Sequence, residues 1–122
     1  MASVDEAIRR VREICLSFTD TREGDHYGEA AYYVKGKLFA TCGGKDGVCE
    51  IIFALEADHA AELLRTDQRF RTYPRDKRGL VVNASEVTDW DEMRALLAES
   101  YEIRRPPARK VPGGARTRRP KR

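Results

Sequence analysis

Runs of apolar residues separated by polar and glycine-rich intervals divide this chain into predicted elements. Residues 29–42 (EAAYYVKGKLFATC) hold two aromatic and aliphatic runs on either side of Lys35-Gly36. Gly36 can adopt a positive φ without a Cβ clash, as a two-residue hairpin turn requires. A third run, 49–55 (CEIIFAL), follows the loop-like interval 43–47 (GGKDG). The three runs predict an antiparallel meander.

Helical periodicity precedes the meander. Apolar residues recur on one face of residues 4–17, and most charged residues lie elsewhere, which predicts an amphipathic first helix. Ser3 and Glu6 have the spacing of a capping box at its start. The expected inner face consists of Val4, Ile8, Val11, Ile14, Cys15 and Phe18.

Three further elements are predicted after the meander. Residues 57–64 form a short helix, residues 79–83 form a fourth short strand, and Thr88 caps a last helix. The polar residues 19–28 and the basic segment 65–78 show neither period and are expected to be loops. The inner residues of the two helices are Ala57, Ala60, Ala61 and Leu64 in the first, and Trp90, Met93, Leu97 and Tyr101 in the second.

This element order predicts one α+β domain. Its antiparallel sheet consists of the three-strand meander plus the further short strand, with the helices packed on one face. Val34, Leu38 and Ala40 are expected to face the core. Residues 104–122 are rich in proline, glycine and cations, which predicts a disordered basic tail and leaves 1–103 as the folded domain.

The net charge of +3 conceals two parts of opposite sign. Residues 1–103 contain 14 basic and 20 acidic residues, whereas the tail contains nine basic residues and no acidic one. Such a tail binds polyanions without reading sequence. No apolar run approaches the roughly 20 residues of a membrane span, and the N-terminus lacks the regions of a signal peptide. We expect a cytoplasmic location, no membrane partner and a monomeric state.

Five short motifs occur in order along the chain: ICLS at 14–17, Gly28, VKGKLFA at 34–40, TDWDE at 88–92 and ESY at 99–101. Together they resemble the MmcQ/YjbR family of small bacterial proteins, over residues 4 to 103. The resemblance implies a compact α+β unit of the CyaY-like or secretion-chaperone-like kind. Members of that family are commonly labelled DNA-binding, so a grip on DNA through hairpins and loops is implied as well.

The leading hypothesis is a non-catalytic domain that binds DNA non-specifically, mainly through phosphates and with strong salt dependence. Phe70 and Tyr73, within the basic segment, would either stack on bases or anchor the core. The nucleic-acid-binding candidates are Lys35, Lys37, Arg69, Arg71, Arg75, Lys77 and Arg78 in the domain, and Arg104, Arg105, Arg109, Lys110, Arg116, Arg118 and Arg119 in the tail.

Two other classes of function remain open. A protein-interaction or small-ligand module, with no physiological role in nucleic-acid binding, would use the uncovered sheet face and offer Tyr32, Tyr33 or Phe39 to a partner. An enzyme has no recognisable constellation of residues here. A deep pocket holding His26 with a polar partner would revive that possibility.

No metal and no cofactor are expected. The odd number of cysteines is typical of reduced thiols. Cys42 and Cys49 are expected to face each other as half-buried thiols, without the second ligand pair of a zinc site, and Cys15 is expected in the core. The acidic residues at 89–92 are explained by the start of a helix.

Overall fold

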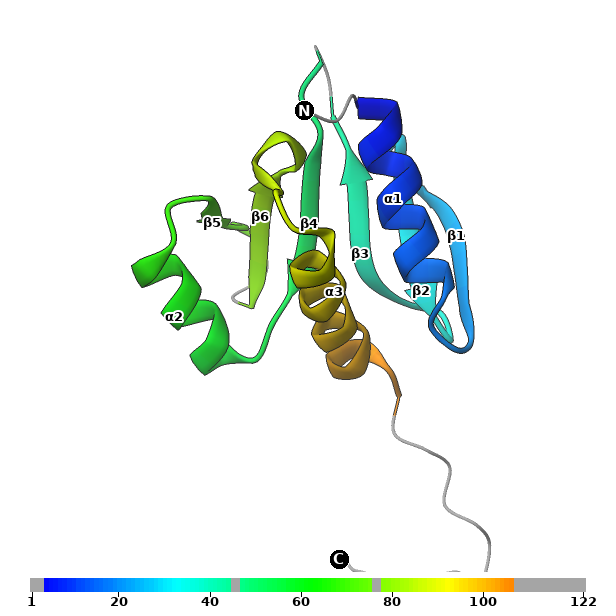
Figure 1. The fold of residues 1–122 in the computed structure, drawn as a ribbon. Coiled ribbons are helices and arrows are strands. Elements are labelled where there is room, and N and C mark those ends of the chain that lie inside the picture. The colour runs from blue at the N-terminus through cyan, green and yellow to red at the C-terminus, as the bar shows by residue number, and fades with distance from the viewer. Residues whose placement is uncertain (1–3, 45–46, 76–77, 107–122) are drawn as a thin grey trace, which may run out of the picture.

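The computed structural model describes residues 4–44, 47–75 and 78–106. The described residues form one antiparallel sheet with the strand order β1-β2-β3-β4-β6-β5, and α1 and α3 cover one face of it (Figure 1). This is the predicted α+β domain with helices on one face. The strands are β1 (Thr21–His26), β2 (Glu29–Val34), β3 (Lys37–Gly43), β4 (Glu50–Ala54), β5 (Phe70–Thr72) and β6 (Gly79–Asn83). The helices are α1 (Val4–Leu16), α2 (Ala57–Thr66), the 3-10 turn η1 (Ala84–Glu86) and α3 (Trp90–Arg104).

Strand β1 occupies most of the segment 19–28, so the expectation of a loop there is wrong. Its residues are polar because β1 lies at the edge of the sheet, where pairing with β2 through the backbone suffices. A two-residue turn joins the strands, with Tyr27 at φ 54° and Gly28 at φ 85°. This is the turn class whose twist matches paired strands. The Asp25 carboxylate accepts a hydrogen bond from the Gly28 N–H at 3.2 Å.

The hairpin between β2 and β3 forms as predicted, with Lys35 at φ 48° and Gly36 at φ 83°. Its register shifts along the strands, since Tyr32 pairs with Ala40 and Tyr33 pairs with Leu38. A β-bulge of this kind adds one residue to one strand and turns the following side chains over. Val34 and Ala40 are buried as predicted, whereas Leu38 lies on the opposite, uncovered face and is not a core residue.

Ser100 on α3 holds the helix onto the sheet beside this bulge. Its fully buried hydroxyl donates to the Phe39 carbonyl at 2.6 Å and accepts from the Ala54 N–H at 2.9 Å. One side chain thus satisfies two backbone groups from β3 and β4, which would otherwise be buried without a partner. This contact holds α3 against the two middle strands of the sheet.

The core lies between the sheet and the helices. The predicted inner face of α1 is confirmed at Val11, Ile14 and Cys15, which are buried. The predicted inner face of α3 is also confirmed, since Met93, Leu97 and Tyr101 are buried and Trp90 packs against the core. The stripe expected on the second helix is largely wrong. Only Ala60 of that stripe is buried, and Leu63 packs inward in place of the exposed Leu64.

The helix caps differ from expectation. Asp89 and not Thr88 caps α3, because its carboxylate accepts from the N–H groups of Asp91 and Glu92. Ser3 lies outside the described residues, and so does the tail from 107 onward. Glu6 forms ion pairs with Arg9 and Arg10. Within the described part of the chain, no helix has the length and apolar character needed to cross a membrane.

Candidate nucleic-acid interface

Strand directions bring cations from three separate segments to one end of the sheet. Because all neighbouring strands are antiparallel, the β2–β3 turn, the end of β4 and the start of β6 share this end. The α3 helix also terminates there (Figure 1). We call the group the basic end. It consists of Lys35, Lys37, Arg75, Arg78, Arg104 and Arg105.

Three cations of the basic end form ion pairs within the domain. Lys35 lies 3.8 Å from the Asp20 carboxylate, and Arg105 lies 2.6 Å from Glu102. Arg78 pairs with Glu56, at the start of α2. By contrast, Lys37 and Arg75 are exposed and have no carboxylate partner among the described residues. These two cations are therefore available to an external anion.

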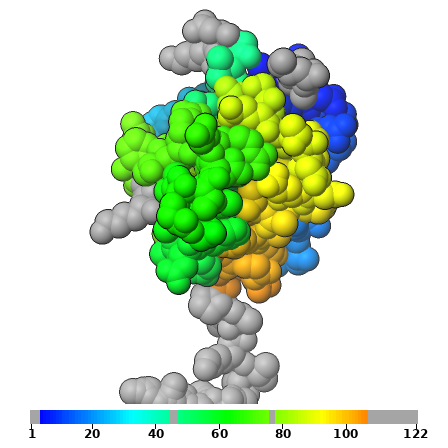
Figure 2. All heavy atoms as spheres, turned by 60° about the vertical axis from the view of Figure 1, so that its left-hand side comes forward, coloured from blue at the N-terminus to red at the C-terminus, as the bar shows by residue number. Residues whose placement is uncertain are grey.

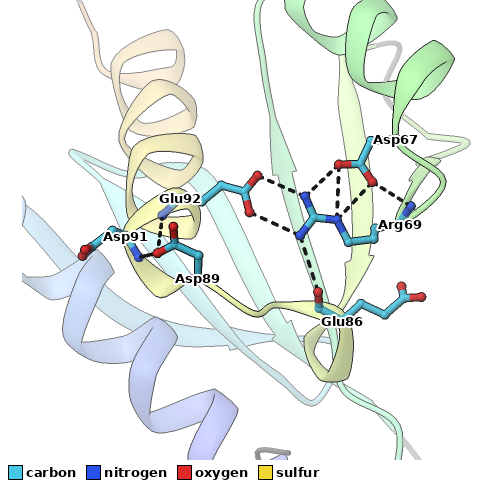
Figure 3. Close-up of polar contacts among 6 residues, drawn as sticks. All are labelled: Asp67, Arg69, Glu86, Asp89, Asp91 and Glu92. Carbon is cyan, nitrogen blue, oxygen red and sulfur yellow. Dashed lines mark hydrogen bonds and ion pairs between the residues drawn. The ribbon is translucent and has the colours of Figure 1, made fainter.

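Arg69 has a different environment, although it belongs to the same basic segment. Its guanidinium lies between Asp67 and Glu92, with hydrogen bonds of 2.7 to 3.2 Å to the two carboxylates (Figure 3). Only 26% of its side chain is exposed. The hydrogen bonds with the carboxylates raise the pKa of Arg69, and those with Arg69 lower the pKa of Asp67. These contacts join the segment between α2 and β5 to the start of α3, and in Figure 2 the green surface of the α2 region lies against the yellow surface of α3.

Arg71 lies on the edge strand β5 and pairs with Glu50 at 3.0 Å. Phe70, beside it, is buried and packs edge-to-face on Phe53, so it anchors the core. Lys77, Arg109, Lys110, Arg116, Arg118 and Arg119 lie outside the described residues. The basic segment of the sequence therefore contains two kinds of cation. Arg69 and Arg71 form ion pairs with carboxylates near β5, whereas Arg75 belongs to the basic end.

A groove of about 610 Å³ runs along the face of the sheet that the helices leave open. Its floor is apolar where Leu38, Ile52 and Ala54 line it. His26 and Tyr27 contribute from the β1–β2 turn, and Tyr73 with Pro74 contributes from the segment after β5. Arg75 and Arg104 also line the groove, which is therefore continuous with the basic end.

Two polar side chains sit in this groove. The Glu29 side chain lies against Gly43, so close that a Cβ on Gly43 would meet the Glu29 Cγ at 2.9 Å. The absence of a side chain at Gly43 thus lets Glu29 lie across the sheet. Thr41 is only 5% exposed, and its hydroxyl has no hydrogen-bond partner among the described residues. A buried hydroxyl without a partner costs stability, which makes it notable in a groove wall.

The aromatic patch expected on the open face is wrong for two of its three members. Tyr32 and Phe39 are buried on the helix side, where Phe39 packs against Phe18 and Tyr101. Tyr33 is on the open face but lies under the Arg22 guanidinium, 5.1 Å from the ring centroid. Both tyrosines that line the groove, Tyr27 and Tyr73, lie outside the strands.

The histidines belong to different environments. His26 lies in the groove wall with its ring 4.6 Å from that of Tyr27, and Glu29 is its cross-strand neighbour. His26 therefore has a polar neighbour. Among the groove residues, however, no nucleophilic side chain paired with a general base lies beside His26. His59 contacts Glu99 at 2.7 Å, and Glu99 also accepts from the Glu56 N–H. That contact ties the start of α2 to α3.

Cys42 and Cys49 face each other as expected, with 3.2 Å between the sulfurs. Both are buried rather than half-buried. The hydrogen bond between them raises the pKa of Cys42 and lowers that of Cys49, where burial opposes the change. Cys15 is buried in the core, and burial raises its pKa. The part of the chain that the structure describes contains no group of three metal-ligating side chains.

Sequence reasoning missed the groove residues Tyr27 and Thr41, and it considered Glu29 only as a polar partner of His26. The pair Tyr27-Gly28 has the composition of a turn, which could have indicated the first hairpin. The approach of Glu29 to Gly43 depends on strand register and leaves no local signal.

Comparison with known families gives one match. The family model described as YjbR matches residues 16–103, which is more than half of the chain. No curated protein and no solved structure matches. The matched region begins at the end of α1 and ends within α3, so it includes the whole sheet.

Proposed function

Because the chain belongs to the YjbR family, we propose that it is a non-catalytic protein that binds nucleic acid through phosphates at its basic end. The observation that carries the proposal is the convergence of three segments on one end of the sheet. It leaves Lys37 and Arg75 exposed without acidic partners among the described residues. These two cations contact separate phosphates along one backbone, and the paired cations around them form the rim.

The spacing of the two cations suits a nucleic-acid backbone. Lys37 begins β3 and Arg75 follows β5, and these strands are three positions apart in the sheet. Strands lie about 4.8 Å apart, so the separation is roughly 14 Å across the sheet. Phosphates of one strand rise about 3.4 Å per step along the axis. Lys37 and Arg75 therefore reach phosphates about four steps apart.

The cations of the tail reinforce the same end. The chain leaves the described residues at Pro106, just beyond Arg104 and Arg105. The nine basic residues from 104 to 122 thus continue from the basic end rather than from the acidic remainder of the domain. Binding by domain and tail together raises affinity through effective concentration.

A salt titration of the full chain tests the proposal. Fluorescence anisotropy with a labelled DNA gives the slope of log affinity against log salt. The magnitude of this negative slope decreases by about 0.7 to 0.9 for each phosphate contact removed. The double variant Lys37→Gln/Arg75→Gln is expected to lower the slope by about 1.5. The matched control Arg65→Gln/Arg94→Gln removes the same two charges from α2 and α3 and should leave the slope unchanged.

Two outcomes contradict the proposal. A full-length chain that shows no salt-dependent binding to DNA removes the function altogether. A chain whose binding survives in Lys37→Gln/Arg75→Gln, and is lost only on truncation after residue 106, assigns binding to the tail and not to the basic end.

A further inference from the structure

The groove on the open sheet face is suited to a flat, partly polar group that is delivered next to a phosphate. Its floor is apolar, and its two tyrosines, Tyr27 and Tyr73, stand at different walls. Tyr27 is 85% exposed, and none of the described aromatic residues covers it except His26. An exposed aromatic ring beside an apolar floor is a stacking surface for a nucleic-acid base.

Polar groups in the groove match the edges of a base. The buried Thr41 hydroxyl has no partner among the described residues and can donate or accept. The Glu29 carboxylate, held across Gly43, accepts from an exocyclic amino group. A hydrocarbon ligand would leave both groups unpaired and buried, which disfavours binding.

The charge distribution fixes the direction in which the ligand enters. Arg75 and Arg104 line the groove where it meets the basic end, and Glu29 belongs to the β1–β2 hairpin. A nucleotide with its phosphate at the arginines places its base toward Thr41 and Glu29. The reverse orientation brings a phosphate to a carboxylate. The groove and the basic end thus form one continuous surface.

We propose that this groove receives an unstacked base from single-stranded nucleic acid while the adjoining phosphates bind at Arg75 and Arg104. The inference rests on the proposed function and names its partner as a single strand. A paired base in a duplex has both faces stacked and its edge occupied, so entry requires unpairing that costs a few kcal/mol. The volume of about 610 Å³ lies within the range of ligand sites and leaves room for one base with its sugar.

The test compares single and double strands with the full-length chain at one fixed, near-physiological salt concentration. The probes are labelled dT12, labelled dA12 and the duplex that they form together. We expect each single strand to bind at least about fivefold more tightly than the duplex, because unpairing opposes entry of a duplex base.

Substitutions in the groove should affect single strands only. Tyr27→Ala and Tyr73→Ala are each expected to weaken single-strand binding about 5- to 100-fold, as the loss of one stacked base does. Thr41→Val keeps the shape of the side chain and is expected to weaken binding about threefold or more. The matched control is Tyr33→Ala, since Tyr33 lies on the same face outside the groove. Circular dichroism melting confirms that each variant is folded.

Crosslinking gives a readout that does not depend on affinity. A single strand with one 5-iodouracil should crosslink on irradiation to peptides that contain Tyr27 or Tyr73. Crosslinks confined to residues 107–122 overturn the inference. Equal affinity for single and double strands, with the tyrosine variants unchanged, also overturns it and leaves the phosphate function in place. Absence of binding to every probe removes both.

Discussion

Arg69 and Arg75 lie six residues apart in one basic segment, yet the structure gives them opposite surroundings. Arg69 precedes β5 and is enclosed by the carboxylates of Asp67 and Glu92 (Figure 3). Arg75 follows Pro74 beyond the end of β5, is exposed and lines the groove. Arg69 meets Asp67 beside it and Glu92 on α3, whereas no carboxylate among the described residues pairs with Arg75. Local charge density therefore does not tell a structural cation from a binding cation.

The largest expected effect is on stability at Arg69. Arg69→Ala should lower the free energy of unfolding by about 2–3 kcal/mol, because it removes charge-assisted hydrogen bonds and leaves two carboxylates facing each other. Urea denaturation followed by circular dichroism measures the change. The slope of log affinity against log salt for DNA binding should be the same in Arg69→Ala as in the wild-type chain.

Two controls sharpen this comparison. Arg69→Lys keeps the charge but loses the paired geometry of the guanidinium, so it should recover only part of the loss. Arg65→Ala removes an exposed ion pair with Glu62 and should cost under about 0.5 kcal/mol. If Arg69→Ala were as stable as Arg65→Ala, the distinction between the two arginines would fail.

The next effect concerns acid. Hydrogen bonding to Arg69 lowers the pKa of Asp67 in the folded protein, so the resulting stabilisation is fully present above the unfolded pKa of about 3.9. It is lost as the pH falls through the lower, folded pKa. The unfolding free energy of Asp67→Asn should therefore depend less on pH below about 4 than that of the unchanged chain.

The measurement is the difference between the two unfolding curves across a pH series, which cancels the other carboxylates. We expect Asp67→Asn to be less stable by about 1 kcal/mol at pH 7 and by less near pH 3. A constant difference at all pH values would mean that Asp67 acts through packing rather than through its charge.

Features that depend on neighbouring residues in the chain could be predicted from the sequence. The turn at Lys35-Gly36, the strands β2 to β4 and β6, and the buried faces of α1 and α3 follow from local periodicity and turn chemistry. The residues of β1 show no such periodicity, because an edge strand needs only a partner for its backbone, and only the turn at Tyr27-Gly28 carries a local signal. The bulge that sends Leu38 to the open face likewise depends on pairing between strands.

The candidate site was predictable in composition but not in arrangement. Lys37 and Arg75 were among the candidates, and so was Arg69, whose partner Glu92 lies 23 residues further along the chain. Tyr73 was predicted either to stack on bases or to anchor the core, and it lines the groove. The placement of Glu29 over Gly43 arises from register and from the missing side chain. Such contacts require the folded chain.

The smallest effects on stability are expected for Arg71 and Arg75, which are both exposed and lie four residues apart. Arg71 forms an exposed ion pair with Glu50 at 3.0 Å, with about half of its side chain accessible. Arg75 has no such pair among the described residues. Both Arg71→Ala and Arg75→Ala should change the unfolding free energy by less than about 0.5 kcal/mol.

Binding should nevertheless separate these two variants. Arg75→Ala is expected to lower the salt slope of DNA binding by about 0.7 to 0.9, because one phosphate contact is lost. Arg71→Ala removes the same charge four residues earlier, but Glu50 already neutralises that position, so the slope should change by less than half as much. Equal changes in slope for the two variants would show that net charge alone drives binding. In that case the exposed, unpaired state of Arg75 would have no consequence for function.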